Sequence, residues 1–129
     1  MSEPVDQGEL RGRAARVVAD YDAPYADPLR GRSGDRVSID REKKTTIEGW
    51  LWCTDPAGRS GWVPEAYLEA GDRDGALRRD YDAIELTVRV GEGLAVHYEE
   101  SGFYWVTHAD GRQGWVPTES VRLLTEVSG

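Results

Sequence analysis

Histidine and cysteine, which often perform catalysis or bind metals, are few and far apart in this sequence. His97 and His108 have no cysteine near them and follow neither metal-site spacing nor a nucleophile elbow. Cys53 stands among apolar neighbours, as a small buried hydrophobic residue does. No helical pattern follows Gly91-Glu92-Gly93, so this segment is not a phosphate-binding loop. We therefore expect no enzyme activity, no metal and no cofactor.

Aromatic side chains are the distinctive chemical feature of the chain. It contains five Trp and six Tyr but one Phe. Trp and Tyr carry a polar group at the edge of a large apolar ring, and they are favoured where a ring is half exposed. This balance indicates that some rings form a binding surface as well as a core.

All five Trp residues belong to an internal repeat spanning residues 49–67 and 102–120. The same 53 positions separate Trp52 and Trp105, Trp62 and Trp115, and Pro64 and Pro117. A fixed offset of this kind means that the chain contains one structural unit twice. Units of roughly 50–65 residues are near the lower limit for independent folding, so each needs a core of large apolar side chains.

Short strands must position these rings. Residues 36–40 alternate polar and apolar side chains, as a half-buried strand does, and residues 50–54 and 60–64 flank a turn with Pro and Gly. The second unit repeats this plan, with a strong hairpin signal at Asp110-Gly111. No segment has a helical period of useful length. The sequence therefore predicts an all-β fold of two tandem five-stranded barrels.

Composition predicts where these barrels begin and end. We expect a disordered tail at 1–14, a first domain at 15–70, a linker at 71–75, a second domain at 76–124 and another tail at 125–129. A linker of this length spans at most about 18 Å, so we expect the two domains to lie side by side.

Charge and hydropathy narrow the choice of partners. The formal charge is −8 and no segment is basic, which makes nucleic acid a poor partner. No apolar run approaches the roughly 18 residues of a spanning helix, and residues 1–4 lack the pattern of a signal peptide. The single cysteine agrees with a reducing compartment. We expect a cytoplasmic protein without a membrane partner, and the lack of Asn beside two Lys suggests a GC-rich bacterial source.

Several short motifs recur in the same order in both halves. They are an Asp-Tyr pair (20–21 and 80–81), a Gly-acid pair (34–35 and 91–92), an aromatic residue that opens the third strand (Trp50 and Phe103), and Gly-Trp-Val-Pro (61–64 and 114–117). In these motifs residues 15–69 and 76–124 each resemble a Src homology 3 (SH3) domain. The resemblance covers about four fifths of the chain.

The resemblance implies a non-catalytic module that binds proline-rich peptides. A polyproline II peptide is already extended, so it loses little entropy when its prolines dock between rigid rings. In the first domain the resemblance places the peptide-binding groove at Tyr21, Asp22, Asp27, Glu48, Trp50, Trp62, Pro64 and Tyr67. Its acidic members would pair with an Arg of the ligand, and Trp62 would form either the groove rim or an interdomain contact.

The second domain departs further from the family pattern. Its weaker groove would use Tyr81, Glu85, Phe103, Trp115 and Pro117. Phe103 replaces the family's Trp, Ser120 replaces the last Tyr, and the two groove loops are shorter by three and four residues. In both domains another family Tyr is missing, because its positions hold Ala19 and Arg79. We therefore expect binding mainly through the first domain.

Three alternatives stay open at this point. The first is a structural or oligomerisation element whose groove aromatics are buried between the domains or against another chain, as in a homo-oligomer. The second is the bacterial barrel variant that recognises cell-wall peptides, against which the missing export signal argues. The third is an aromatic cage of Tyr21, Trp50 and Tyr67 that holds a methylated side chain by cation–π attraction.

Overall fold

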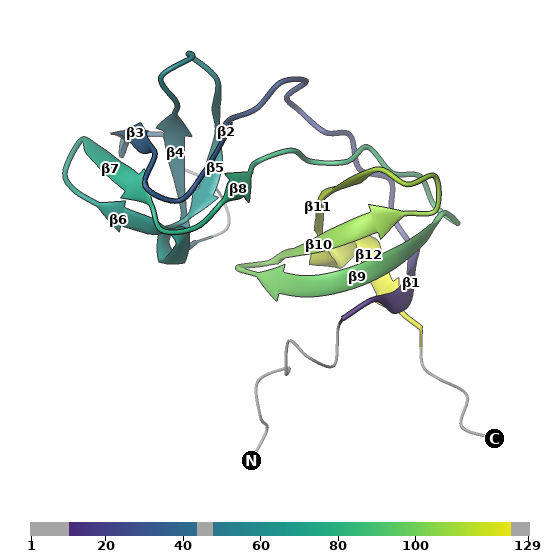
Figure 1. Cartoon of the computed structure of the whole chain (residues 1–129). Helices are drawn as coiled ribbons and strands as arrows, with labels where there is room; N and C mark the ends of the chain where they lie inside the picture. The colour runs from purple at the N-terminus through teal and green to yellow at the C-terminus, as the bar shows by residue number, and fades with distance from the viewer. Residues whose placement is uncertain (1–10, 44–47, 125–129) are drawn as a thin grey trace. The chain divides into compact units, whose positions relative to one another are not determined.

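Strands dominate the computed structural model, which describes residues 11–43 and 48–124 (Figure 1). The elements are β1 (Arg13–Val17), β2 (Arg30–Gly31), β3 (Arg36–Asp40), β4 (Trp50–Thr54), β5 (Ser60–Pro64), η1 (Glu65–Tyr67), β6 (Leu68–Ala70), β7 (Asp74–Leu77), β8 (Tyr81–Asp82), β9 (Gly93–Glu100), β10 (Phe103–His108), β11 (Gln113–Pro117), η2 (Thr118–Ser120) and β12 (Val121–Leu123). Within the described ranges η1 and η2 are single 3-10 turns, and no helix is long and apolar enough to cross a membrane. The predicted all-β class is confirmed.

The predicted tails fall mostly outside the described residues. Residues 1–10 and 125–129 are not described, and at the N-terminal side Arg11 and Gly12 form a turn. β1 begins at Arg13, two residues inside the segment expected to be a tail.

Two five-stranded antiparallel sheets form the fold, as predicted. One has the strand order β11-β10-β9-β1-β12 and the other has the order β5-β4-β3-β7-β6, while β2 and β8 form a separate two-stranded ribbon. The strands β9 to β12 repeat β3 to β6 in chain order, so the two sheets have equivalent topology.

The first strand of each sequence repeat belongs to the sheet of the other repeat. β1 pairs with β9 and β12, and β7 pairs with β3 and β6. The chain therefore divides into two compact units: unit 1 contains the residues up to Ala23 and those from Glu85 onward, and unit 2 is Pro24–Ile84. The segments 15–70 and 76–124 delimit the sequence repeats, but they do not coincide with these units.

The connection between β6 and β7 explains this exchange. Only residues 71–73 separate the two strands, and so short a connection favours pairing of the strands that it joins. The Gly71 N–H donates to the Asp74 carbonyl at 2.7 Å, and the Arg41 guanidinium donates to the carbonyls of Gly71 (2.6 Å) and Asp72 (2.9 Å). Residues 71–75, expected to link two domains, instead form the turn of a hairpin and the start of β7 inside unit 2.

Unit 2 is a continuous segment, whereas unit 1 is interrupted by it. In unit 2 the strand β7 comes late in the chain, yet it occupies the sheet position that β1 occupies in unit 1. Unit 2 is thus circularly permuted relative to the repeat order. In unit 1 the chain leaves after Ala23 and returns at Glu85. The strands that pair with β1 therefore follow the whole of unit 2 in the sequence.

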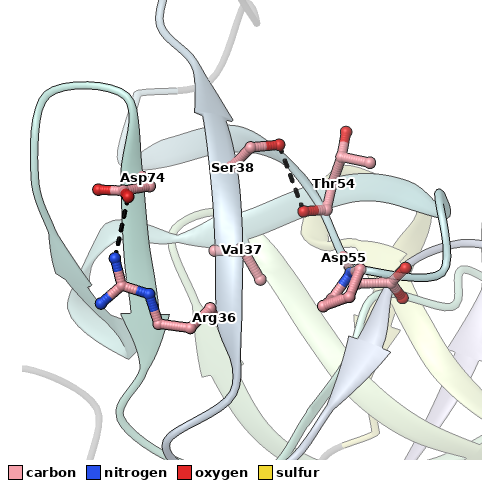
Figure 2. A pocket seen from close by; sticks show the side chains of 7 residues that line it. Arg36, Val37, Ser38, Thr54, Asp55 and Asp74 are labelled. Atoms are coloured by element: carbon pink, nitrogen blue, oxygen red, sulfur yellow. Dashed lines mark hydrogen bonds and ion pairs between the residues drawn. The ribbon is translucent and has the colours of Figure 1, made fainter.

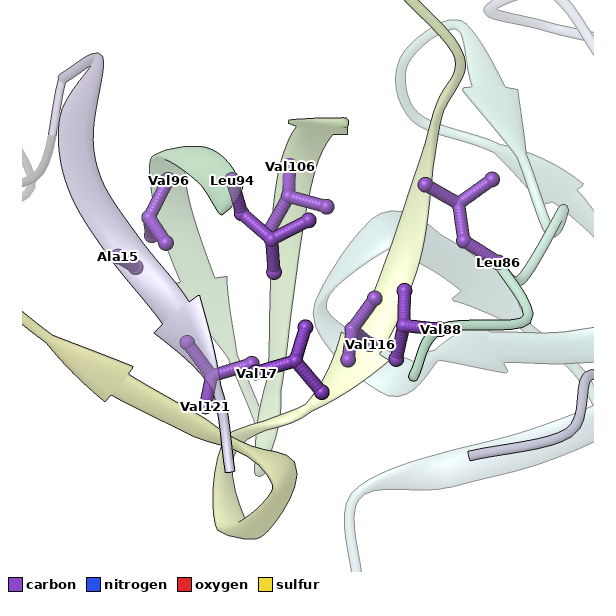
Figure 3. Close-up of a cluster of buried hydrophobic side chains, with 9 residues drawn as sticks. All are labelled: Ala15, Val17, Leu86, Val88, Leu94, Val96, Val106, Val116 and Val121. Carbon is purple, nitrogen blue, oxygen red and sulfur yellow. The ribbon is translucent and has the colours of Figure 1, made fainter. Parts of the chain in front are cut away.

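Each unit has its own apolar core. In unit 1 the core consists of Ala15, Val17, Leu86, Val88, Leu94, Val96, Val106, Val116 and Val121 (Figure 3). In unit 2 the buried apolar residues include Leu29, Val37, Ile39, Cys53, Val63, Leu68 and Leu77. Full burial of one Val or Leu side chain stabilises by about 1.5–3 kcal/mol, so cores this small depend on nearly every member.

The hairpin predicted at Asp110-Gly111 is confirmed. The turn joins β10 to β11, Gly111 has φ +96°, and its N–H donates to the His108 carbonyl at 2.8 Å. Unit 2 has the equivalent turn at Gly58, with φ +89° and a 2.9 Å hydrogen bond to the Asp55 carbonyl. Glycine adopts such a positive φ without the steric cost of a Cβ atom.

Candidate functional site

The structure divides the predicted first groove between the two units. Unit 2 contains its members Asp27, Glu48, Trp50, Trp62, Pro64 and Tyr67, and unit 1 contains Tyr21 and Asp22. Of the predicted second groove, Tyr81 lies in unit 2, and Glu85, Phe103, Trp115 and Pro117 lie in unit 1. The two tyrosines change places because Tyr21 follows β1 and Tyr81 follows β7, the exchanged strands.

In unit 2, Tyr81 takes the place expected for Tyr21 beside the aromatic residues of the first repeat. Trp50 lies opposite Pro64 in the β4–β5 pair. The ring of Tyr67 in η1 meets that of Tyr81 edge to face, with centroids 5.6 Å apart and planes at 74°. The Tyr81 hydroxyl also donates to the Trp62 carbonyl at 2.7 Å. Such edge contacts suit the ring quadrupoles, so rings from both repeats form one cluster.

The rings continue along the same face of β4 and β5. Trp52 lies opposite Trp62, two residues beyond the Trp50–Pro64 pair and in unbroken register, and residues two apart in a strand face the same side. The ring centroids of Trp52 and Trp62 are 5.0 Å apart, and those of Tyr25 and Trp52 are 5.1 Å apart. We call the aromatic residues Tyr25, Trp50, Trp52, Trp62, Tyr67 and Tyr81, with Pro64, the ring row of unit 2.

Exposure differs along the ring row. Trp50 is 8% exposed, and Tyr67 and Tyr81 are 7% exposed, whereas Tyr25, Trp52 and Trp62 are half-buried. The accessible part of the row is therefore its Tyr25–Trp52–Trp62 end. The groove predicted from sequence contained Trp62 but neither Tyr25 nor Trp52, although strand alternation already places Trp52 on the side of Trp50.

Two cations of unit 2 lie over rings of this row. Lys43 Nζ is 4.0 Å from the ring centroid of Trp52 and 5.9 Å from that of Tyr25. The guanidinium carbon of Arg79 is 4.5 Å from the ring centroid of Tyr67. Arg79 occupies one of the positions where the family pattern has a Tyr. At this position the chain therefore places a cation, and not a second ring, over Tyr67. Both contacts show that the row attracts positive charge.

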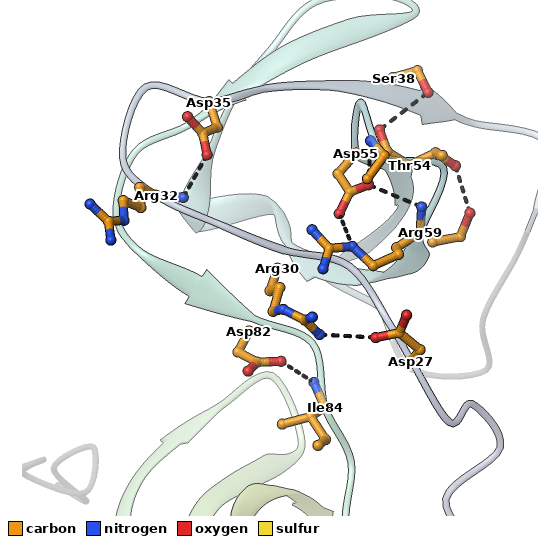
Figure 4. A network of polar contacts seen from close by, with 12 residues as sticks. Asp27, Arg30, Arg32, Asp35, Ser38, Thr54, Asp55, Arg59, Asp82 and Ile84 are labelled. Atoms are coloured by element: carbon orange, nitrogen blue, oxygen red, sulfur yellow. Dashed lines mark hydrogen bonds and ion pairs between the residues drawn. The ribbon is translucent and has the colours of Figure 1, made fainter.

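The acidic residues of unit 2 are engaged to different extents. The Arg30 guanidinium donates to Asp27 at 2.9 Å, with both side chains exposed (Figure 4). Glu48 is also exposed. Asp55 is 7% exposed and accepts hydrogen bonds from the Arg59 N–H and side chain at 3.0 and 2.8 Å. Burial acts to raise the pKa of Asp55, but the hydrogen bonds and charge of Arg59 outweigh it and lower this pKa below its usual value.

In unit 1 polar contacts engage predicted residues of both grooves. The Tyr21 hydroxyl donates to the Glu85 carboxylate, and Arg89 donates to Asp22 at 2.6 Å. Burial raises the pKa of Glu85, with the hydrogen bond from Tyr21 opposing it. Phe103 lies opposite Pro117 in the β10–β11 pair, as Trp50 lies opposite Pro64 in unit 2.

Trp115 is packed inside unit 1. It is 2% exposed, and its ring centroid is 5.8 Å from that of Tyr98 and 5.3 Å from that of Trp105. Its counterpart Trp62 is half-buried, so the same position of the repeat is more accessible in unit 2. The two units therefore differ in the ring surface that they offer.

A shallow hollow of about 260 Å³ lies elsewhere in unit 2 (Figure 2). It is lined by Arg36, Val37, Ser38, Thr54, Asp55, Pro56 and Asp74, none of which was predicted as a binding residue. An Arg36–Asp74 ion pair at 2.9 Å and a 3.4 Å hydrogen bond from the Ser38 hydroxyl to the Thr54 carbonyl cross its surface. These groups are satisfied by one another, and the ring row lies outside this lining.

The described residues contain no cluster of metal-ligating side chains. His97 Nε2 lies 2.7 Å from the Thr107 hydroxyl, and the buried His108 lies between Glu92 and Asp110 at 3.2 and 3.1 Å. Burial raises the pKa of the Cys53 thiol to about 12, which keeps it protonated and unreactive at neutral pH. The chemistry that the described surface offers is therefore ring contact and charge.

A family model described as "Variant SH3 domain" matches residues 14–70 and residues 77–124. The searches of curated proteins and of solved structures gave no match. The two matched segments follow the sequence repeats, and the strand exchange distributes each of them over both compact units.

Proposed function

Since this chain belongs to the variant SH3 family, we propose that it binds an extended, proline-rich segment of another protein through unit 2. SH3 domains are generally non-catalytic protein-interaction modules. The finer assignment, which unit binds and what it binds, is the proposal made here.

The ring row is the observation that carries this proposal. A polyproline II segment presents a regular series of proline rings, and it is already extended before it binds. The Trp50–Pro64 and Trp52–Trp62 pairs are consecutive on one face, with Tyr25 beside Trp52, so they form a series of rigid apolar surfaces. The half-buried end at Tyr25, Trp52 and Trp62 is where the peptide makes first contact.

Charge favours a basic residue in the bound segment. Lys43 already lies over Trp52, which shows that this ring accommodates a cation, and Asp27 is an exposed carboxylate of the same unit. An arginine of the ligand replaces Lys43 over Trp52 or Arg30 at Asp27. The formal charge of −8 adds a long-range attraction for basic segments.

Calorimetric titration with synthetic proline-rich peptides that end in Arg tests the proposal. We expect a dissociation constant of about 1–100 μM, since a short peptide covers little area. Trp52→Ala should weaken binding at least about ten-fold, because truncating a ring at the centre of an interface removes a large contact. Trp105→Ala is the matched control, since Trp105 holds the equivalent position in unit 1, and it should leave the affinity unchanged.

Two results would overturn the assignment to unit 2. One is the absence of heat at millimolar peptide. The other is a Trp52→Ala variant that binds as the unmodified chain does while Trp105→Ala loses binding.

The second candidate function is a structural or oligomerisation element. The low exposure of Trp50, Tyr67 and Tyr81 leaves these rings little surface for a peptide, and for this reason a structural element is the second candidate. Sedimentation velocity over a range of concentrations distinguishes the two candidates. A stable oligomer that dissociates in the Trp50→Ala variant, together with no peptide binding, would support this function instead.

A further inference from the structure

The position of β1 in unit 1 is a strand-binding slot. β1 lies between β9 and β12, with Ala15 opposite Leu94 on one side and Leu123 on the other. Ala15 and Val17 are 2% and 1% exposed in the core of unit 1 (Figure 3). Without β1, the sheet would present two unpaired strand edges, which are templates for another strand.

Along the polypeptide chain, β1 is joined to the rest of unit 1 only by the residues of unit 2. The contacts that hold it join β1 directly to residues beyond 85: the Val17 N–H donates to the Glu92 carbonyl at 2.9 Å, and the Leu124 N–H donates to the Ala14 carbonyl at 3.0 Å. One contact opposes its retention, because Arg16 lies directly opposite Arg122, and like charges across a strand pair repel. The same hydrogen bonds would form with a β1 supplied by another copy.

The equivalent slot of unit 2 rejects β1. Gly75 of β7 is opposite Val37 and Ala70, as Ala15 of β1 is opposite Leu94 and Leu123. A Cβ atom at position 75 would lie 2.7 Å from the Glu69 carbonyl oxygen and 3.2 Å from the Ala70 Cα. These two nearest atoms belong to the backbone of β6, so the alanine of β1 does not fit there without displacement of β6.

We propose that β1 is a strand donor for unit 1 of either its own chain or a second copy, and that it is excluded from unit 2 because the position of Gly75 has no room for a Cβ atom. Of the two equivalent slots, a released β1 then fits that of unit 1. Exchange between two copies produces a reciprocal dimer in which each unit 1 is completed by the partner's N-terminal segment, from β1 to the end of that segment at residue 23. Exchange of an identical element is a low-cost route to such a dimer, because the dimer repeats the contacts of the monomer.

Disulfide capture between two differently substituted full-length chains tests this proposal. Arg16→Cys and Arg122→Cys are placed in separate chains, since both positions are exposed and opposite each other in the β1–β12 pair. The reduced chains are mixed at high concentration, warmed to promote opening, cooled and oxidised. Directly opposed antiparallel residues are within disulfide reach, so a covalent heterodimer marks β1 of one copy beside β12 of the other.

The matched control replaces Arg122→Cys by Glu69→Cys. Glu69 is exposed and lies opposite Ala76, the residue of β7 that corresponds to Arg16. We expect at least about five-fold more heterodimer from the Arg16→Cys and Arg122→Cys mixture than from this control, given the cost of overpacking at position 75. Cys53 is fully buried and is present in every chain, so any disulfide that it forms contributes equally to all mixtures.

A chain that carries both Arg16→Cys and Arg122→Cys shows whether the geometry permits the bond at all. If this chain closes its internal disulfide but the mixture gives no more heterodimer than the control, β1 does not exchange between copies and the proposal fails. An equal amount of heterodimer in both mixtures would also overturn it, because the position of Gly75 would then not exclude β1 from unit 2.

Discussion

At the residue scale, the equivalent turns of the two units each contain a carboxylate that pairs with an Arg, but the two carboxylates hold different turn positions and differ in burial. The Asp55 side chain is 5% exposed and accepts hydrogen bonds from the Ala57 N–H, the Arg59 N–H and the Arg59 side chain. The Asp110 side chain is 47% exposed and accepts from the Arg112 N–H and side chain. A buried carboxylate depends more on its partners, because it has lost its hydration.

Asp55→Asn should therefore destabilise unit 2 by about 1–3 kcal/mol at pH 7. The pKa of Asp55 is lowered in the folded chain, so its charge contributes stability above the unfolded pKa of about 3.9 and loses it as pH falls through the folded pKa. The difference between the variant and the unmodified chain should shrink below about pH 4. Urea unfolding followed by tryptophan fluorescence at neutral and acid pH measures it. Asp110→Asn is the control, and an equal loss there would contradict the argument from burial.

At the element scale, β1 and β7 compete for equivalent positions in two equivalent sheets. Their strand partners have the same topology, so hydrophobic alternation alone does not distinguish them. Two local features do: the connection at 71–73 keeps β7 beside β6, and Gly75 fits where a side chain would meet backbone. The sequence motifs correctly located the turns at Gly58 and Gly111 and the Trp-containing strands, because those depend on neighbours in the chain. They did not predict the strand exchange, which depends on a choice between distant partners.

Gly75→Ala tests the second of these features. The added Cβ atom should destabilise unit 2 by about 1–3 kcal/mol, because it would lie 2.7 Å from the Glu69 carbonyl oxygen. Gly93→Ala, in a strand of unit 1, is the control, since nothing lies within 4 Å of a Cβ atom at that position. Thermal unfolding of both variants gives the comparison. If the Gly75→Ala chain is as stable as the Gly93→Ala chain, the backbone of β6 shifts to admit the Cβ atom at little cost, and the argument from Gly75 fails.

At the scale of the whole molecule, the two units differ in how far apart their strands are in sequence. All strands of unit 2 come from residues 24–84, whereas β1 of unit 1 pairs with β12 more than one hundred residues later. Closing a longer loop costs more entropy, and non-local pairing slows folding. Unit 2 should therefore fold first. Unit 1 should fold afterwards, when β1 pairs with β9 and β12.

Fragments of the chain test this organisation. A fragment of residues 24–84 contains every strand of unit 2 and should unfold cooperatively, with a higher midpoint than a fragment of residues 14–70. The second fragment follows the family match, but it must place Ala15 where Gly75 fits. Circular dichroism during heating gives both midpoints. A fragment 14–70 that is as stable as fragment 24–84 would contradict the assignment of β7 to unit 2.

The amino-acid sequence by itself determined the repeat, the all-β class, the family and the residue types of the ring surface. These follow from local spacing, since alternation, turn residues and the Gly-Trp-Val-Pro motif each act over a few positions. Only the tertiary structure decided which strand completes which sheet. That choice placed Tyr81 beside Tyr67 and moved Tyr21 to the other unit. The physical reason is that the two first strands have similar patterns, and a short connection and one absent Cβ atom determine the pairing.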